Sequence, residues 1–253
     1  MTNYLLFLLY GPLVSWGDIA VDERRPTADH PTKSAILGMI AAALGLHRDE
    51  DETQRQLAES YGFAVRLDDP GIFLHDYHTS QRPPGKSMRG LPIRRDELAR
   101  EKLVTKLSYR EHRCDVLATI CLWRRTEAMS PYTLDDIASA LQEPHFTLYL
   151  GRKACPLGLP LLPVQVQKET LADAYASSEC RSLLDHAGYI APSLLERMYS
   201  ERQSRVFWEG VANVGFDHTQ SVERRDQIDH RASWQFRTRL EHEGLCVANM
   251  PGT

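Results

Sequence analysis

The N-terminal segment constrains the fold of this chain most, because it is apolar at every position. Residues 4–10 read Tyr-Leu-Leu-Phe-Leu-Leu-Tyr, and Gly11-Pro12 ends the run. A short apolar run closed by a turn signal predicts a fully buried strand. The run is too short to span a bilayer, and no lysine or arginine precedes it as in a signal peptide. We therefore expect a cytoplasmic protein that makes no membrane contact.

The order of the predicted elements indicates the fold class. Apolar patterning predicts strands at 4–10, 63–67, 72–77, 116–123 and 162–167, with helices at 31–44, 49–60 and 133–141. Apart from extra elements, these follow the order strand, helix, strand, strand, helix, strand, which predicts an α+β fold with a ferredoxin-like core, the topology of the RNA-recognition motif. We expect residues 1–167 to form this domain. Residues 168–253 should form a smaller C-terminal region packed on it, with late strands at 206–209 and 234–240.

Charge is distributed unevenly along the chain. The formal net charge is −4, which weakly opposes a wholly basic nucleic-acid-binding protein. Residues 82–113, however, contain ten basic and four acidic residues, a net charge of +6, so the remainder carries −10. The overlapping segment 79–110 has little core periodicity and predicts an extended excursion or a long hairpin. A basic excursion of this kind contacts a phosphate backbone by releasing counterions; the alternative is a solvated, flexible loop.

Two shorter segments are candidate anion sites. Arg152-Lys153 follows Gly151, a residue that would let the backbone approach a ligand closely. Thr32-Lys33-Ser34 lies in the first turn of a predicted helix, where hydroxyls, backbone N–H groups and the helix dipole converge. The alternatives are an ordinary surface turn for the first segment and simple helix capping for the second.

The sequence offers little catalytic or metal-binding material. His75 and His78 are three residues apart on a predicted strand, so they face opposite sides and are poorly placed to bind one metal ion. His112 lies among arginines and is either a general acid or base for RNA cleavage or a solvated histidine. The sequence contains no nucleophile elbow, P-loop, zinc-protease motif or dinucleotide fingerprint. We expect no catalytic residue, no cofactor and no metal.

Seven segments, taken together in this order, resemble the Cas-five-type subunit family of the type I-E CRISPR Cascade complex. They are Gly11-Pro-Leu-Val-Ser-Trp-Gly17, Arg25-Pro-Thr27, Pro31-Thr-Lys-Ser34, Leu44-Gly-Leu46, Asp76-Tyr-His-Thr79, Tyr109-Arg-Glu-His-Arg-Cys-Asp115 and Tyr149-Leu-Gly-Arg-Lys-Ala-Cys-Pro-Leu157. They are spread over most of the chain, and the match is weakest over residues 168–230.

The resemblance implies a non-catalytic, RNA-binding subunit of a ribonucleoprotein complex that serves antiviral defence. Members of the family have a modified RNA-recognition fold with a long β-hairpin thumb, which would be segment 79–110 here. They bind the repeat-derived 5′ handle of the CRISPR RNA (crRNA) and cap that end of the complex. The implied partners are the crRNA 5′ handle, the backbone and large subunits of Cascade and, indirectly, target DNA near the 5′ end of the guide.

Two other function classes stay open. In one CRISPR subtype the related subunit cuts precursor RNA with a tyrosine, a lysine and a histidine. Tyr109 and His112 are the nearest counterparts, but Lys106 is not adjacent to His112, so the set is not matched. A metal-independent endoribonuclease is therefore the alternative function. A protein-interaction adaptor with no RNA role is the third.

The RNA-binding candidates follow from the basic segments and from the resemblance. Bases of a single-stranded handle can stack on aromatic side chains, while phosphates attract arginine and lysine. For Trp16, base stacking and burial beside Gly17 are equally compatible with the sequence. The candidates are Trp16, Arg25, Thr32, Lys33, Ser34, Tyr77, His78, Arg82, Lys86, Arg89, Arg110, Arg113, Arg152 and Lys153.

Overall fold

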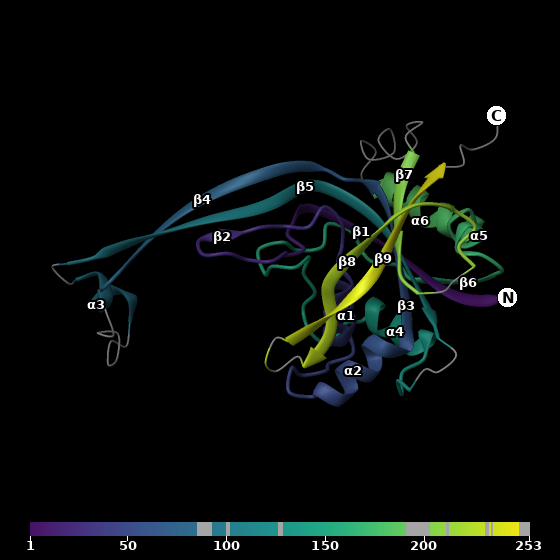
Figure 1. Ribbon diagram of the computed structural model, residues 1–253, viewed down its shortest axis with the longest axis horizontal. Helices are drawn as coiled ribbons and strands as arrows, with labels where there is room; N and C mark the ends of the chain where they lie inside the picture. The colour runs from purple at the N-terminus through teal and green to yellow at the C-terminus, as the bar shows by residue number, and fades with distance from the viewer. Residues whose placement is uncertain are drawn as a thin grey trace.

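The protein has a mixed α/β fold built on one mainly antiparallel sheet (Figure 1). The computed structural model describes residues 1–84, 93–99, 102–125, 129–190, 203–210, 213–230, 233 and 235–247. The strands are β1 (Thr2–Val14), β2 (Arg24–Arg25), β3 (Tyr61–Asp69), β4 (Ile72–Arg82), β5 (Val104–Arg124), β6 (Val164–Lys168), β7 (Gln203–Trp208), β8 (Asp217–His230) and β9 (Gln235–Val247). The helices are α1 (Lys33–Ala43), α2 (Asp51–Ser60), α3 (Arg94–Leu98), α4 (Leu134–Gln142), α5 (Leu171–Tyr175) and α6 (Ser178–Ile190).

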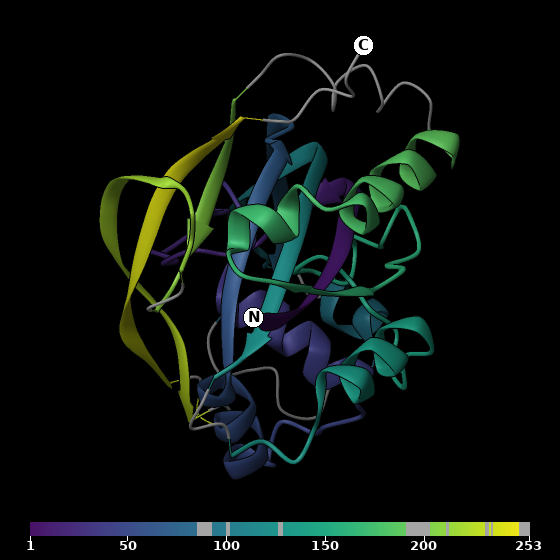
Figure 2. The ribbon, with the colours of Figure 1, turned by 90° about the vertical axis from the view of Figure 1, so that its right-hand side faces the viewer.

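The first strand lies inside the sheet, between β5 and β6. Leu5 and Phe7 contact a core shared with α1, α2 and α4, whereas Tyr4 and Leu6 contact a second core shared with α5 and α6. Helices thus cover both faces of the sheet (Figure 2). Because neither face of β1 meets water, the run is apolar at consecutive positions, and the buried strand predicted at residues 4–10 is confirmed.

Helices α1 and α4 begin at local capping signals. The Thr32 hydroxyl of α1 accepts a hydrogen bond from the amide of Ala35. Thr133 and Asp136 form a capping box at the start of α4. These bonds satisfy amides that have no partner inside the helix, so the chain itself encodes both helix starts.

A long hairpin projects from the sheet (Figure 1). Its strands, residues 72–82 of β4 and 104–114 of β5, pair without interruption from Ile72 opposite Cys114 to Arg82 opposite Val104. We call these two segments the projecting hairpin. The sequence predicted either an extended excursion or a long hairpin over residues 79–110. The described residues form a hairpin, and its first strand begins at Ile72, seven residues before residue 79.

The chain after residue 202 extends the same sheet rather than forming a separate one. β7 pairs with β3, β9 pairs with β7, and β8 pairs with β9. The late strands predicted from the sequence overlap β7 and β9, although Trp234 itself lies outside the described residues. β8 was not predicted, and the domain boundary at 167/168 stays a prediction. Among the helices that the structure describes, none has the length and apolarity needed to cross a membrane.

Candidate nucleic-acid interface

The base of the projecting hairpin brings together arginines that are far apart in the sequence. The short strand β2 pairs in parallel with β5, which places Arg25 beside Arg110. Both residues are exposed. Neighbouring strands of a sheet lie about 5 Å apart, so the side chains of Arg25 and Arg110 leave the backbone next to each other.

Arg152 joins them from the loop after α4. Its Nη2 donates a hydrogen bond of 3.0 Å to the carbonyl oxygen of Arg25, and its Nη1 lies 3.2 Å from Nε2 of His112. We call Arg25, Arg110 and Arg152 the cationic cluster. Lys153, the next residue along the chain, is exposed beside it.

Gly151 sets the position of Arg152. Its φ is +87°, and a Cβ atom at this position would lie 1.7 Å from the carbonyl oxygen of Ser15. The neighbouring Ser15 amide donates to the carbonyl oxygen of Leu150. The close backbone approach that we expected toward a ligand is therefore made to the protein's own chain, and it fixes the loop that carries Arg152 and Lys153.

The cationic cluster forms no salt bridge among the described residues, and the nearby carboxylate of Asp76 offsets its charge only in part. Burial and then the charge of Arg110 lower the pKa of Arg152, and Arg25 adds to the effect. Burial and then Arg152 lower the pKa of His112. In the part of the chain that the structure describes, the salt bridges do not include Arg25, Arg110 or Arg152. Three mutually repelling cations at one place favour binding of an anion such as a phosphate backbone.

The predicted residues of β4 lie on the two faces of the hairpin. Asp76 is opposite Arg110, so His78, two residues further on, shares the face of the cationic cluster. His78 contacts Asp76 directly. Tyr77 is on the other face, where its ring lies 5.2 Å from that of Tyr109 and is half-exposed. An aromatic pair and a cationic cluster thus meet at one stretch of hairpin.

Other predicted candidates lie apart from the cluster. Arg82 is at the far end of β4, ten residues along the strand from Ile72. Arg113 is at the hairpin base, where it donates to the carbonyl oxygen of Pro70 and lies over the ring of Phe73. Lys86 and Arg89 lie outside the described residues.

The prediction that Lys33 binds RNA is wrong, because its side chain is not exposed. The side chain is fully buried, and its Nζ donates hydrogen bonds to Glu209 at 2.5 Å and to Gln227 at 2.9 Å. Burial lowers its pKa to about 8, although Glu209 counteracts this shift. The ammonium therefore neutralises a buried carboxylate and is not available to RNA phosphate.

The start of α1 is not an open anion site either. The amide of Lys33 donates to the carboxylate of Asp226 at 2.8 Å, and the Thr32 hydroxyl caps the amide of Ala35. The first turn of α1 is therefore a capped helix start, which was the alternative interpretation. The carboxylate of Asp226 occupies the place that we considered for a phosphate. The hydroxyls of Thr32 and Ser34 are half-buried and line a cavity of about 700 Å³.

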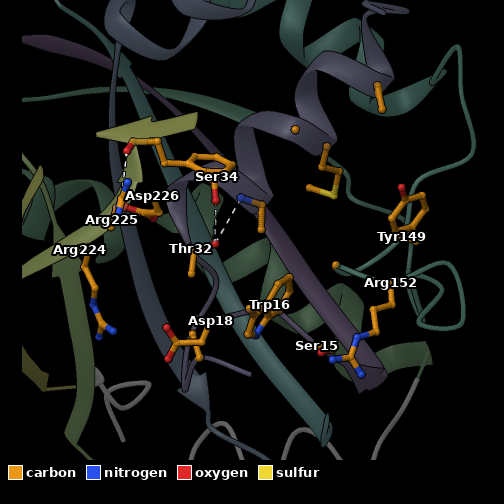
Figure 3. A pocket seen from close by; sticks show the side chains of 18 of the residues that line it. Ser15, Trp16, Asp18, Thr32, Ser34, Tyr149, Arg152, Arg224, Arg225 and Asp226 are labelled. Carbon is orange, nitrogen blue, oxygen red and sulfur yellow. Dashed lines mark hydrogen bonds between the residues drawn. The ribbon is translucent and has the colours of Figure 1, made fainter. Parts of the chain in front are cut away.

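Trp16 lines the same cavity, together with Arg152 (Figure 3). It is only 6% exposed, so burial describes its position better than stacking at an open surface. Its indole Nε1 is buried without a hydrogen-bond partner. Sequence reasoning missed the residues that close the cavity on the opposite side, Arg224 and Arg225 of β8. The only sequence signal for them is one basic pair in a strand that has no apolar periodicity.

Comparison with known proteins identifies the family. The family model described as "CRISPR-associated protein (Cas_Cas5)" matches residues 4–240. The curated protein "CRISPR system Cascade subunit CasD" from Escherichia coli (strain K12) is 34% identical over 194 residues, which cover 74% of this chain and 78% of that protein. A solved structure titled "CRISPR RNA-guided surveillance complex" superposes with a TM-score of 0.61 and 23% identity, over 98% of this chain and 91% of the other. Another, titled "Crystal structure of Cas protein", has a TM-score of 0.62 and 23% identity, over 99% of this chain and 98% of the other. These two structures share the fold, and the sequence matches show that the chain belongs to the Cas5 family of CRISPR-associated proteins.

Proposed function

We propose that this chain is an RNA-binding subunit of a crRNA-guided Cascade complex of type I-E. In that role it binds the 5′ handle of the crRNA, caps that end of the complex, and contacts the backbone and large subunits. The observation that carries the proposal is the cationic cluster at the base of the projecting hairpin, where three arginines lie together without a salt bridge among the described residues. Its relative from Escherichia coli is named as a Cascade subunit, which supports the assignment to such a complex.

The architecture supports a modified RNA-recognition fold. The strand order β6-β1-β5-β3 and the antiparallel pairing of these neighbours fit a ferredoxin-like core. The projecting hairpin then serves as the thumb. It lies over the guide near its 5′ end, so its contact with target DNA is indirect. The aromatic pair of Tyr77 and Tyr109 offers flat surfaces to unpaired bases.

We propose further that the subunit does not cleave RNA. Tyr109 and His112 are three residues apart on β5 and so project to opposite faces of the hairpin. His112 is 5% exposed, and its Nε2 takes a hydrogen bond from Arg152, which leaves only a buried Nδ1. A general acid or base must reach the proton that it transfers, and neither nitrogen is presented to a ligand.

Cleavage is tested by incubating the purified full chain with CRISPR repeat RNA in EDTA. We expect the RNA to remain intact with the wild-type protein and with the His112→Ala variant. Specific cleavage that is abolished by His112→Ala would establish the endoribonuclease alternative and contradict the proposal.

Assembly with RNA is tested by purifying the chain through a tag together with its neighbouring subunits. We expect RNA of one defined length to copurify, and we expect its amount to fall in the double variant Arg110→Ala, Lys153→Ala. Lys168→Ala, on β6 at the far side of the sheet, is the matched control and should retain the RNA. A wild-type complex without RNA would favour the adaptor function instead.

A further inference from the structure

The cavity next to the cationic cluster has the properties of a binding site for one base. Its walls come from separate parts of the chain: the segment at Trp16, helix α1, the loop that carries Arg152, and strands β8 and β9 (Figure 3). At about 700 Å³ it falls in the size range of small-ligand pockets. Met39 and Phe236 give it apolar surfaces, and the hydroxyls of Thr32 and Ser34 give it polar edges.

One buried donor in this cavity has no partner. Trp16 is 94% buried, and its Nε1 forms no hydrogen bond with the protein. An indole N–H that is withdrawn from water without an acceptor costs free energy, so it normally has a partner. An acceptor supplied by a ligand in the cavity would satisfy it.

Charged residues also line the cavity, but Arg224 is paired with Glu241 and Arg225 donates to the carbonyl oxygen of Phe236. The ligand that fits is therefore an aromatic group with hydrogen-bonding edges rather than a free anion. The first amide of α1 already donates to Asp226, and Thr32 already caps the amide of Ala35, so the helix start has little left to offer a phosphate. Apolar walls with hydroxyl and N–H groups at the edge suit the face and the hydrogen-bonding edge of a nucleobase. Arg152 lines the cavity and also belongs to the cationic cluster, so a phosphate backbone bound at the cluster passes the entrance.

We propose that one base of the bound single-stranded RNA is turned out of the strand and inserts into this cavity. The inference rests on the proposed function, because the RNA backbone must first be held at the cationic cluster. Single-stranded RNA is commonly recognised through unstacked bases that are buried against aromatic or apolar side chains. Since β8 forms one wall, the cavity also depends on the C-terminal hairpin of β8 and β9 being in place.

The test couples a change in the RNA to a change in the cavity. The probe is a synthetic RNA with the sequence of the copurifying RNA, in which one nucleotide at a time is replaced by an abasic sugar phosphate. Gly38→Leu fills the cavity from α1, and Trp16→Phe keeps a ring but removes the N–H group. Ala176→Leu adds the same side chain at an exposed position after α5 and is the control.

For the wild type and for Ala176→Leu, we expect one abasic position to weaken binding by at least about tenfold, the effect of losing one buried base. Gly38→Leu should bind intact RNA as weakly as the wild type binds that abasic RNA, and should not respond to the abasic change. Trp16→Phe should weaken binding of intact RNA more than binding of the abasic RNA. Tight RNA binding by the wild type with identical abasic profiles in all variants would overturn the base-insertion proposal and leave the proposed function standing. Failure of the wild type to bind any of the RNAs would overturn both.

Discussion

Lys33 shows how a residue with the chemistry of a phosphate ligand becomes a structural cation. A lysine beside two hydroxyls at a helix start is a good anion site by local criteria. Its actual partner, Glu209, is 176 residues away in the sequence and reaches it only because β7 lies next to β3. Local sequence therefore predicts the helix start but not the burial of its lysine.

Replacing Lys33 separates stability from RNA binding. Lys33→Met keeps a long side chain but leaves the buried Glu209 carboxylate short of one cation. We expect the free energy of unfolding to fall by about 3 kcal/mol, as when one partner of a buried ion pair is removed. The RNA affinity of the folded protein should stay the same. The exposed Lys153→Met should do the opposite, and urea denaturation with RNA titration of both variants checks this. An unchanged free energy of unfolding together with weakened RNA binding in Lys33→Met would contradict a structural role for Lys33.

His30 gives the fold a pH-dependent contact. Its imidazole is buried, stacked at 3.6 Å on Phe207, and hydrogen-bonded to Asp29 at 2.7 Å and to Glu241 at 3.1 Å. Burial alone would lower the pKa of His30, but the two carboxylates raise it above its usual value. His30 in turn helps to lower the pKa of Glu241 to about 2 against the effect of burial.

The sign of this linkage predicts how stability changes with pH. Because the folded-state pKa of His30 is raised, its contribution is present below about pH 6.5 and is lost as the pH rises through the folded value. The contribution of Glu241 is lost only as the pH falls from about 4.5 toward 2. Urea denaturation of the wild type and of His30→Gln should therefore show a stability difference that shrinks as the pH is raised above about 6.5. A difference that stays constant as the pH rises would show that His30 does not titrate in this way.

The projecting hairpin shows what sequence patterning detects in an element and what it does not. Residues 116–123 are mostly apolar and buried, so that half of β5 was predictable, whereas residues 104–114 are mostly polar, are at least partly exposed apart from His112, and show no strand period. The same applies to β8, whose sequence is polar and whose pairing with β9 is interrupted by three register shifts. Patterning identifies strands mainly by burial, so residues 104–114 of β5 and all of β8 escaped it, although the exposed residues 72–77 of β4 and the edge strand β6 were predicted. Capped helices such as α1 and α4 were found because their signals are local.

The pairing register allows the hairpin to be shortened without disturbing the sheet. Thr79 is opposite Leu107, so replacing residues 80–106 by Asn-Gly closes the two strands with a tight turn. We expect the melting temperature to change little, because the main core lies elsewhere. Assembly of the complex or capture of target DNA should be impaired. Gel filtration and target-DNA binding of the complex check this, and a shortened protein that assembles and binds target normally would contradict the thumb assignment.

At the scale of the whole molecule, unpaired basic residues and paired acidic residues among those that the structure describes lie in different places. The net −4 is the sum of a basic segment and an acidic remainder. In the three-dimensional structure, many of the acidic side chains face basic partners inside the protein, as Asp29, Asp226, Glu209 and Glu241 do around the C-terminal hairpin. The cationic cluster has no such partners among the described residues. The sequence predicted its members individually, but only the pairing of β2 with β5 and the close contact at Gly151 bring them together.

The salt dependence of RNA binding tests the central claim most directly. The measurement is the equilibrium affinity of the full chain, in its complex, for the copurifying RNA at several salt concentrations, with the wild type, Arg110→Ala and Lys168→Ala compared. If Arg110 neutralises one phosphate, its loss should weaken binding and reduce the slope of log affinity against log salt by about one, whereas Lys168→Ala should leave the slope unchanged. Equal slopes and affinities for all three proteins would contradict an RNA interface at the base of the projecting hairpin.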